Sequence, residues 1–131
     1  MREREDRQDI GELLIRYATG IDRRDWSLFR TVFTGDCELD YGQIGSWRGV
    51  DAVTDFMEQV HAAAGHTLHR ITNQAVDVEG DRAAARSYVD VLIMAADNPT
   101  GVNAAGFYDD ELVRTPQGWR IARRRFTQVR I

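Results

Sequence analysis

Apolar residues recur at intervals of three and four positions along the first part of the chain. They are Ile10, Leu13, Leu14, Tyr17, Ala18 and Ile21. This spacing predicts an amphipathic helix with one buried face, and Asp6 is expected to cap it or to lie in its first turn. Asp22 comes four residues after Ala18 and eight after Leu14. The pattern therefore places Asp22 at the end of the helix, on the edge of its buried face.

Two further helices are predicted in the first half of the chain. Asp25 is the expected cap of a short one, whose apolar side would hold Trp26, Phe29, Val32 and Phe33. Residues 37–41 are then expected to form a strand, followed by a turn between Gly42 and Gly45. Residues 51–63 predict the third helix. Its apolar face would consist of Val53, Phe56, Met57 and Val60.

The second half of the chain mixes apolar and polar residues in four strand-like runs that short turns separate. The runs cover residues 68–78, 83–96, 103–113 and 119–129. Short connections of this kind predict an antiparallel meander. Helices followed by strands indicate one α+β domain over residues 1–131. Its three helices would pack on one face of a curved, mostly antiparallel sheet.

The composition argues against several kinds of binding partner and several kinds of chemistry. The formal net charge of −4 argues against binding to nucleic acid or to an anionic membrane, and no apolar run is long enough to span one. The chain has no lysine, which excludes lysine Schiff-base chemistry, and Cys37 is its only cysteine, which excludes an intramolecular disulfide. The polar N-terminal residues do not have the pattern of a signal peptide, so a cytoplasmic location is expected.

The candidate chemistry depends on one carboxylate and one imidazole. His69 and Asn73 are expected on one face of the strand over residues 68–78, and Asp22 is expected near the same apolar interior. An Asp that binds one ring nitrogen of His69 would leave the other nitrogen free to act as a base near neutral pH. Two plainer interpretations stay open. Asp22 could simply end its helix in water, and His69 could be a structural side chain.

The arginines at positions 123–125, near the C-terminus, indicate a functional site less clearly than Asp22 and His69 do. Strict alternation along the last strand places Arg124 on the same face as Phe126, with Trp119 and Ile121 on the opposite face. Arg124 would then lie near a buried surface. There it could bind an anionic group or pair with an acid such as Asp90.

No metal ion or other cofactor is expected. His61, His66 and His69 are close in sequence, but no carboxylate lies at ligand spacing among them. His66 and His69 are three residues apart, so on a strand their side chains would point to opposite faces. The histidines therefore do not predict a metal site.

Three segments carry a resemblance to a known family. The longest is YATGIDRRDWSLFRTVFTGDCELDYG, over residues 17–42, and the other two are TLHRITN and the ending GWRIARRRF. With the order of elements, these segments resemble the SnoaL-like branch of the nuclear-transport-factor-2-like superfamily over essentially the whole chain. They look like scytalone dehydratase, hexachlorocyclohexane dehydrochlorinase and bile-acid 7α-dehydratase. The resemblance implies a cone-shaped α+β fold. Because the superfamily hosts many activities, the fold alone implies no substrate.

The resemblance also implies roles for single residues. Asp22 matches the catalytic aspartate on the family's first helix, and His69 matches its strand-borne catalytic histidine. Tyr17 and Tyr41 match tyrosines that bile-acid 7α-dehydratase and scytalone dehydratase, respectively, use in their sites. Arg124 aligns with an arginine implicated in the dehydrochlorinase.

The chain departs from scytalone dehydratase at three positions. Ile21 stands where that enzyme has a tyrosine, Val89 where it has a second histidine, and Tyr108 where it has a pocket asparagine. These differences argue against scytalone as the substrate. The residues expected to line a substrate pocket are Asn73, Phe56, Val60, Val89 and Tyr108.

The residues and the resemblance together predict a cofactor-independent enzyme that moves protons on a small apolar or cyclic molecule. His69 would be the general base, oriented by Asp22, and Tyr17 or Tyr41 would donate a hydrogen bond to a developing oxyanion. The reaction would be that of a dehydratase or other lyase, or of an isomerase or cyclase. A non-catalytic ligand-binding or assembly subunit of the same fold is the alternative. The run over residues 83–96 is apolar on both faces, which favours a homodimer or higher homo-oligomer.

Overall fold

The computed structural model describes residues 2–130. In chain order, the elements are α1 (Arg2–Asp22), α2 (Trp26–Arg30), β1 (Phe33–Asp40), a 3₁₀ turn (Gly42–Ile44), β2 (Ser46–Arg48), α3 (Val50–Ala62), β3 (Thr67–Glu79), β4 (Arg82–Met94), β5 (Gly101–Thr115) and β6 (Gly118–Arg130). The predicted order of elements is confirmed, and the short strand β2 is an addition to it. Within the described residues, no helix is long and apolar enough to cross a membrane.

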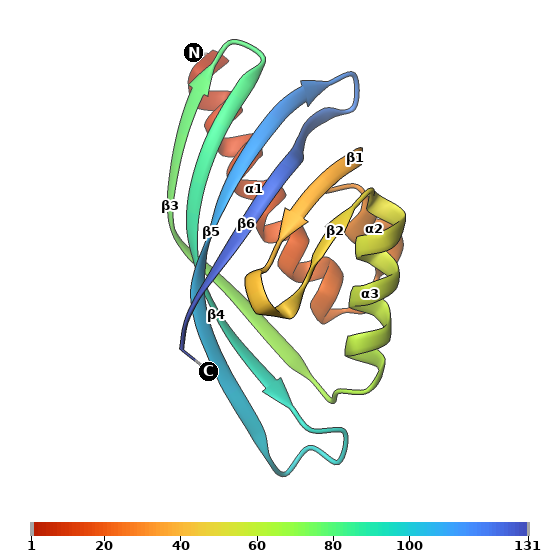
Figure 1. Cartoon of the computed structure of the whole chain (residues 1–131). Helices are drawn as coiled ribbons and strands as arrows, with labels where there is room; N and C mark the ends of the chain where they lie inside the picture. Colours follow the sequence, from red (N-terminus) through yellow and green to blue (C-terminus); the bar gives the residue numbers. More distant parts are fainter. Residues whose placement is uncertain (1, 131) are drawn as a thin grey trace.

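The six strands form one sheet in the order β2-β1-β6-β5-β4-β3. β3 to β6 make the predicted antiparallel meander, and β1 lies parallel to β6. Figure 1 shows a strongly curved sheet with α1 along one face, and with α2 and α3 beside β1 and β2. We call the face that α1 covers the inner face and the opposite one the outer face. The predicted class, three helices on a curved and mostly antiparallel sheet, is confirmed.

Two glycines allow the tight turns that set the register of the meander. Gly80 lies between β3 and β4 with φ 63°, and Gly118 begins β6 with φ 107°. Backbone in this left-handed region favours glycine because it has no Cβ. The resulting register turns alternate residues of β4 and β5 inward, among them Val89 and Tyr108. A slip of one residue would turn both side chains to the outer face.

The junction between α2 and β1 differs from the prediction. Asp25 caps α2 as expected, because its carboxylate accepts a hydrogen bond from the backbone N–H of Leu28. The helix then ends at Arg30, and Phe33 begins β1 instead of extending the helix. Val32 and Phe33 are both buried. A short apolar run of this kind does not distinguish the end of a helix from the start of a buried strand.

The residues buried on α1 and α3 can be compared with those that helical spacing predicted. On α1, the buried residues include Ile10, Leu13, Leu14, Tyr17, Ala18 and Ile21, as predicted. On α3, Val53 and Met57 are buried and Phe56 is partly buried. Val60 is 47% exposed, so it does not belong to the buried face that helical spacing predicted for it. His61 is buried in its place, because it follows Met57 by four residues and Val53 by eight.

Asp6 has a different role from the one that the sequence predicted. Because α1 begins at Arg2, Asp6 lies in the second turn of the helix and does not cap it. Its buried carboxylate accepts hydrogen bonds from the Arg114 guanidinium over 2.8 and 2.7 Å and from the Trp119 indole N–H over 3.1 Å. Asp6 therefore ties α1 to the β5–β6 hairpin.

This tie predicts a pH-dependent contribution to stability. The hydrogen bonds from Arg114 outweigh the effect of burial and lower the pKa of Asp6 from 3.8 to about 2. A carboxyl whose pKa is lower in the folded state stabilises the fold above its unfolded pKa, and the contribution is lost as the pH falls toward the folded pKa. We expect Asp6→Asn to lower the free energy of unfolding near neutral pH, and its difference from the unsubstituted chain to shrink between about pH 4 and about pH 2. Urea unfolding across that range measures the difference, and a difference that does not change with pH would contradict the role of the charge.

Candidate active site

Asp22 and His69 meet where the end of α1 lies against β3, and we call this pair the dyad. The ring Nδ1–H of His69 donates to Asp22 Oδ1 over 2.8 Å, and the backbone N–H of His69 donates to Oδ2 over 2.9 Å. The Thr67 hydroxyl donates a third hydrogen bond, to Oδ1, over 2.9 Å. The side chains of Asp22 and His69 are 20% and 7% exposed. The two residues singled out in the sequence are therefore in contact, at a partly buried position.

The charge of Asp22 fixes the tautomer of His69. Burial raises the pKa of Asp22, but the hydrogen bonds from His69 and Thr67 outweigh it and hold the pKa below its usual value. An ionised carboxylate has no hydrogen to donate, so Nδ1 of the neutral ring carries the proton and Nε2 carries a lone pair. A neutral imidazole held in this way can act as a general base.

A cation behind the dyad holds Thr67 in place. Arg24 lies two residues beyond α1, with a left-handed backbone (φ 56°) that is uncommon for arginine. Its guanidinium donates to Thr67 Oγ1 over 2.9 Å and to two backbone carbonyl oxygens. Because Thr67 Oγ1 accepts from Arg24, its own hydrogen is directed to Asp22. Arg24 and Thr67 thus orient the dyad from behind, and no local sequence pattern indicates this long-range contact.

Tyr17 and Tyr41 share a hydrogen bond in the interior. Their hydroxyl oxygens are 2.8 Å apart, and the residues are 1% and 7% exposed. The Tyr17 ring lies edge-on to Tyr108, with 5.6 Å between centroids, and 6.2 Å from the ring of His69. Burial raises the pKa of all three phenols, so each is a neutral hydrogen-bond donor near neutral pH. Within the Tyr17–Tyr41 pair one hydroxyl donates to the other, so the second O–H is not used between them.

Arg124 is a buried cation beside these phenols. It donates to the Asp110 carboxylate over 2.8 and 3.0 Å, and its guanidinium lies over the rings of Tyr17 and Tyr108. Asp110 corrects the expected pairing with Asp90, whose side chain is half-exposed elsewhere. Burial works against the charge, but Asp110 holds the pKa of Arg124 above its usual value. Its Nη1 is buried without a hydrogen-bond partner.

Irregularities in two strands overturn the faces that strict alternation predicts. In β6, the register against β5 shifts at Ala122, so Ile121 shares the inner face with Arg124. In β3, the register shifts near Asn73, which has φ 50° and an exposed side chain. Asn73 therefore does not share a face with His69 and does not line the site. An extra residue in one strand reverses the order of faces beyond it.

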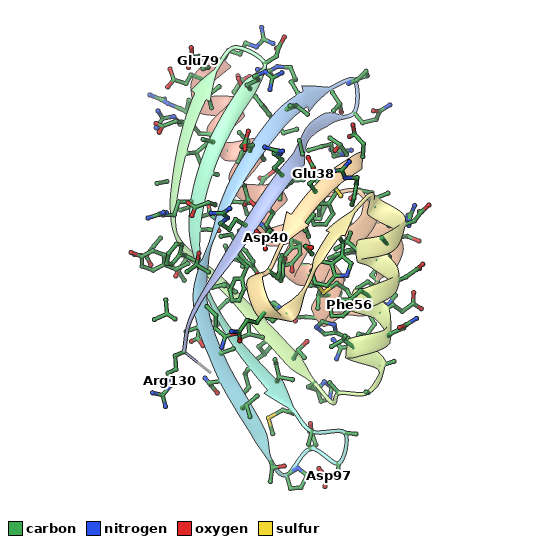
Figure 2. All side chains as sticks on the ribbon, in the orientation of Figure 1. Glu38, Asp40, Phe56, Glu79, Asp97 and Arg130 are labelled. Carbon is green, nitrogen blue, oxygen red and sulfur yellow. The ribbon has the colours of Figure 1, made fainter. Side chains whose placement is uncertain are left out.

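The other predicted lining residues lie in different places. Val89 and Tyr108 are buried on the inner face of the sheet. Phe56 projects from α3 (Figure 2) and packs against Trp47 of β2, with 4.4 Å between ring centroids. Val60, as described above, is largely exposed. Val89 and Tyr108 thus lie on the inner face, and Phe56 contacts Trp47, whose ring centroid is 5.5 Å from that of Tyr41.

His61 is a buried imidazole that the predicted site did not include. Its Nδ1–H donates to the carbonyl oxygen of Met57 over 2.7 Å. Its ring centroid lies 5.9 Å from that of His69 and 6.0 Å from that of Trp26. The signal that could have found it is helical spacing, because it continues the buried stripe through Val53 and Met57.

Two open hollows lie over the outer face of the sheet. The larger, of about 970 Å³, is lined by charged side chains that include Glu38 and Asp40 of β1 (Figure 2). Neither of these two hollows is lined by Asp22 or His69, whose side chains are 20% and 7% exposed. Over residues 2–130, no three or more His, Cys, Asp or Glu side chains are arranged to hold a metal ion.

Known proteins of similar sequence and of similar structure point to the same family. A family model described as a SnoaL-like domain matches residues 2–125. An uncharacterized protein of Mycobacterium tuberculosis is 35% identical over 124 residues, which cover 91% of this chain and 82% of that protein. A candidate aromatic ring hydroxylase from Novosphingobium aromaticivorans is 33% identical, with a TM-score of 0.86 and coverage of 97% of this chain and 91% of that one. A candidate scytalone dehydratase from the same organism has a TM-score of 0.86 at 23% identity, covers 93% of this chain and 83% of its own, and shows the fold alone.

Proposed function

The chain belongs to the SnoaL-like domain family, and from this membership and the geometry of the dyad we propose that it is a cofactor-independent proton-transfer enzyme. It acts on a small apolar or cyclic carbonyl compound, by elimination or by isomerisation. The observation that carries the proposal is the hydrogen bond from His69 Nδ1 to Asp22, because in the neutral ring it leaves the lone pair of a base on Nε2.

In the proposed reaction His69 Nε2 removes a proton from the carbon next to the substrate carbonyl. The imidazolium that forms is stabilised by the Asp22 carboxylate, which accepts from Nδ1–H before and after the transfer. Thr67 and Arg24 keep Asp22 in place during this change of charge. General-base catalysis of this kind contributes about 10²–10⁴-fold to a rate.

The enolate that results carries negative charge on the carbonyl oxygen. The second O–H of the Tyr17–Tyr41 pair is the proposed donor to that oxygen, since both phenols stay neutral. Arg124 acts through Tyr17, because its charge lies 4.3 Å from the centre of that ring and favours negative charge nearby. If the adjacent carbon bears a leaving group, elimination follows. If it does not, reprotonation at another carbon gives isomerisation.

The proposal is tested by exchange of hydrogen for deuterium at the carbon next to a carbonyl. Cyclohexanone is incubated with the protein in D₂O, and loss of the α-hydrogen signal is followed by ¹H NMR. The expected result is exchange that rises in proportion to protein concentration and is lost in His69→Gln. Exchange that is identical in the His69→Gln protein would overturn the proposal and would support a binding or assembly role for the fold.

A further inference from the structure

Arg24 occupies a backbone position that most often belongs to glycine. Its N–H donates to the carbonyl oxygen of Ile21 over 2.9 Å, at the end of α1. The N–H of Asp25 donates to the carbonyl oxygen of Gly20 over 2.8 Å. These two bonds form a Schellman motif, whose left-handed residue is usually glycine, and Arg24 is that residue, with φ 56°. A Cβ strains this backbone. Strained positions of this kind cluster at functional sites, and Arg24 comes two residues after Asp22.

The guanidinium of Arg24 joins the end of α1 to two segments that are remote in the sequence. Besides its bond to the end of the helix, it donates to Thr67 Oγ1 over 2.9 Å through Nη1 and to the carbonyl oxygen of Gly65 over 2.6 Å through Nη2. Gly65 is itself fixed, because its N–H donates to the carbonyl oxygen of Met94 over 2.8 Å and a Cβ on it would collide with that of Ala95. The guanidinium is therefore held at three points, one of which has no room to move.

The contact with Arg24 decides where the hydroxyl hydrogen of Thr67 points. Thr67 is 3% exposed, and its hydroxyl makes hydrogen bonds with Arg24 and with Asp22. A guanidinium can only donate, so the hydroxyl accepts from Arg24 and donates to Asp22 Oδ1. The same oxygen accepts from Nδ1–H of His69, while Oδ2 accepts from the backbone N–H of His69. With all three donors in place, the carboxylate has a single orientation, the one that holds the ring.

We propose that Arg24 is a positioning residue that sets the rate of proton transfer, acts only through the hydroxyl of Thr67, and takes no part in binding the substrate. The inference rests on the proposed proton-transfer function and adds to it a residue behind the dyad. Without the guanidinium the hydroxyl of Thr67 is free to turn, so Asp22 loses a donor and holds the ring of His69 less firmly. Misplacing a catalytic group by about 1 Å can cost about 10²-fold in rate, even when the substitution lies away from the chemistry.

Arg24→Gly removes the side chain and leaves the turn intact. Glycine suits the left-handed position, so α1 is expected to end as before and the variant to stay folded. We expect kcat for deuterium exchange of cyclohexanone to fall by about 10-fold to 10²-fold, while KM changes by less than about twofold. The matched control is Arg23→Gly, the same change one residue earlier. Arg23 is exposed, so this variant is expected to keep its kcat even if it loses some stability.

A second substitution, Thr67→Val, shows whether Arg24 acts through Thr67. Valine has the shape of threonine but no hydroxyl, so Thr67→Val alone is expected to slow exchange about as much as Arg24→Gly does. If the two residues act as one unit, the double variant is no slower than either single variant. Effects that multiply in the double variant would show that Arg24 acts independently of Thr67 and would overturn the inference. A normal kcat in folded Arg24→Gly would overturn it as well.

NMR of the His69 ring separates this inference from the proposed function, because it needs no turnover. The Nδ1–H that Asp22 accepts is expected to exchange with water faster in Arg24→Gly than in Arg23→Gly. Equal rates in the two variants would overturn the role of Arg24 and leave the proposed function standing. Exchange of cyclohexanone that does not depend on His69 would overturn the proposed function instead, and the ring proton would still report on Arg24. Arg24→Asn also tolerates a left-handed backbone and is too short to reach Thr67, so it covers the case in which Arg24→Gly does not fold.

Discussion

Asp22→Asn is expected to reduce proton-transfer turnover by about 10²–10⁴-fold while the fold is retained. Asp22 accepts at both oxygens, from the ring N–H of His69 at Oδ1 and from its backbone N–H at Oδ2. Asparagine offers one oxygen and one NH₂ group, so whichever way the amide turns, one donor meets another donor. If the NH₂ group faces the ring, His69 must move its proton to Nε2 and loses the lone pair that makes it a base. If the NH₂ group faces the backbone, the contact that holds β3 against α1 is lost.

The control for this prediction is His66, which lies three residues before His69. His69→Gln is expected to lose at least as much turnover as Asp22→Asn, because it removes the base that Asp22 orients. His66 is exposed, so His66→Gln should keep both turnover and stability. Deuterium exchange of cyclohexanone reports turnover, and thermal unfolding reports whether each variant is folded. A folded Asp22→Asn protein with normal exchange would show that the dyad is structural.

Much of the dyad could be predicted because both residues lie on regular elements. Asp22 continues the helical stripe through Leu14 and Ala18, and the buried stripe of α1 fixes the side on which its carboxylate emerges. His69 lies in the undistorted first part of β3, where alternation still holds. The pattern gave the direction of each side chain, and the family resemblance indicated which of several Asp and His residues would meet.

The surroundings of the dyad could not be predicted, because they depend on irregular backbone and on long-range contacts. Asn73 was assigned to the face of His69 by alternation, and a shift of register in β3 removes it. Ala122 has the same effect in β6, where it brings Ile121 and Arg124 to one face. Neither shift is marked by a glycine or a proline. Arg24 reaches Thr67 across 43 positions of sequence, a contact that only the folded chain creates.

Asp110→Asn is expected to lower the free energy of unfolding by about 3–5 kcal/mol. The side chains of Asp110 and Arg124 are 0% and 1% exposed, and two hydrogen bonds join them. Removing the negative charge leaves the guanidinium buried without compensation, and its Nη1 already has no partner. The loss would be a large share of the 5–15 kcal/mol that is usual for a domain. Urea unfolding followed by tryptophan fluorescence measures it.

The neighbouring Asp109 provides the control, because it also pairs with an arginine but on the outer face. Its pair with Arg86 is largely exposed, so Asp109→Asn should cost about 0–1 kcal/mol. Removing both charges should restore part of the lost stability. The double variant Asp110→Val with Arg124→Met is therefore expected to be more stable than Asp110→Asn. If Asp110→Asn and Asp109→Asn had equal small effects, water would be reaching the inner pair. If the double variant were the least stable of the three, the packing of Arg124 against Tyr17 and Tyr108, and not its charge, would be what the fold depends on.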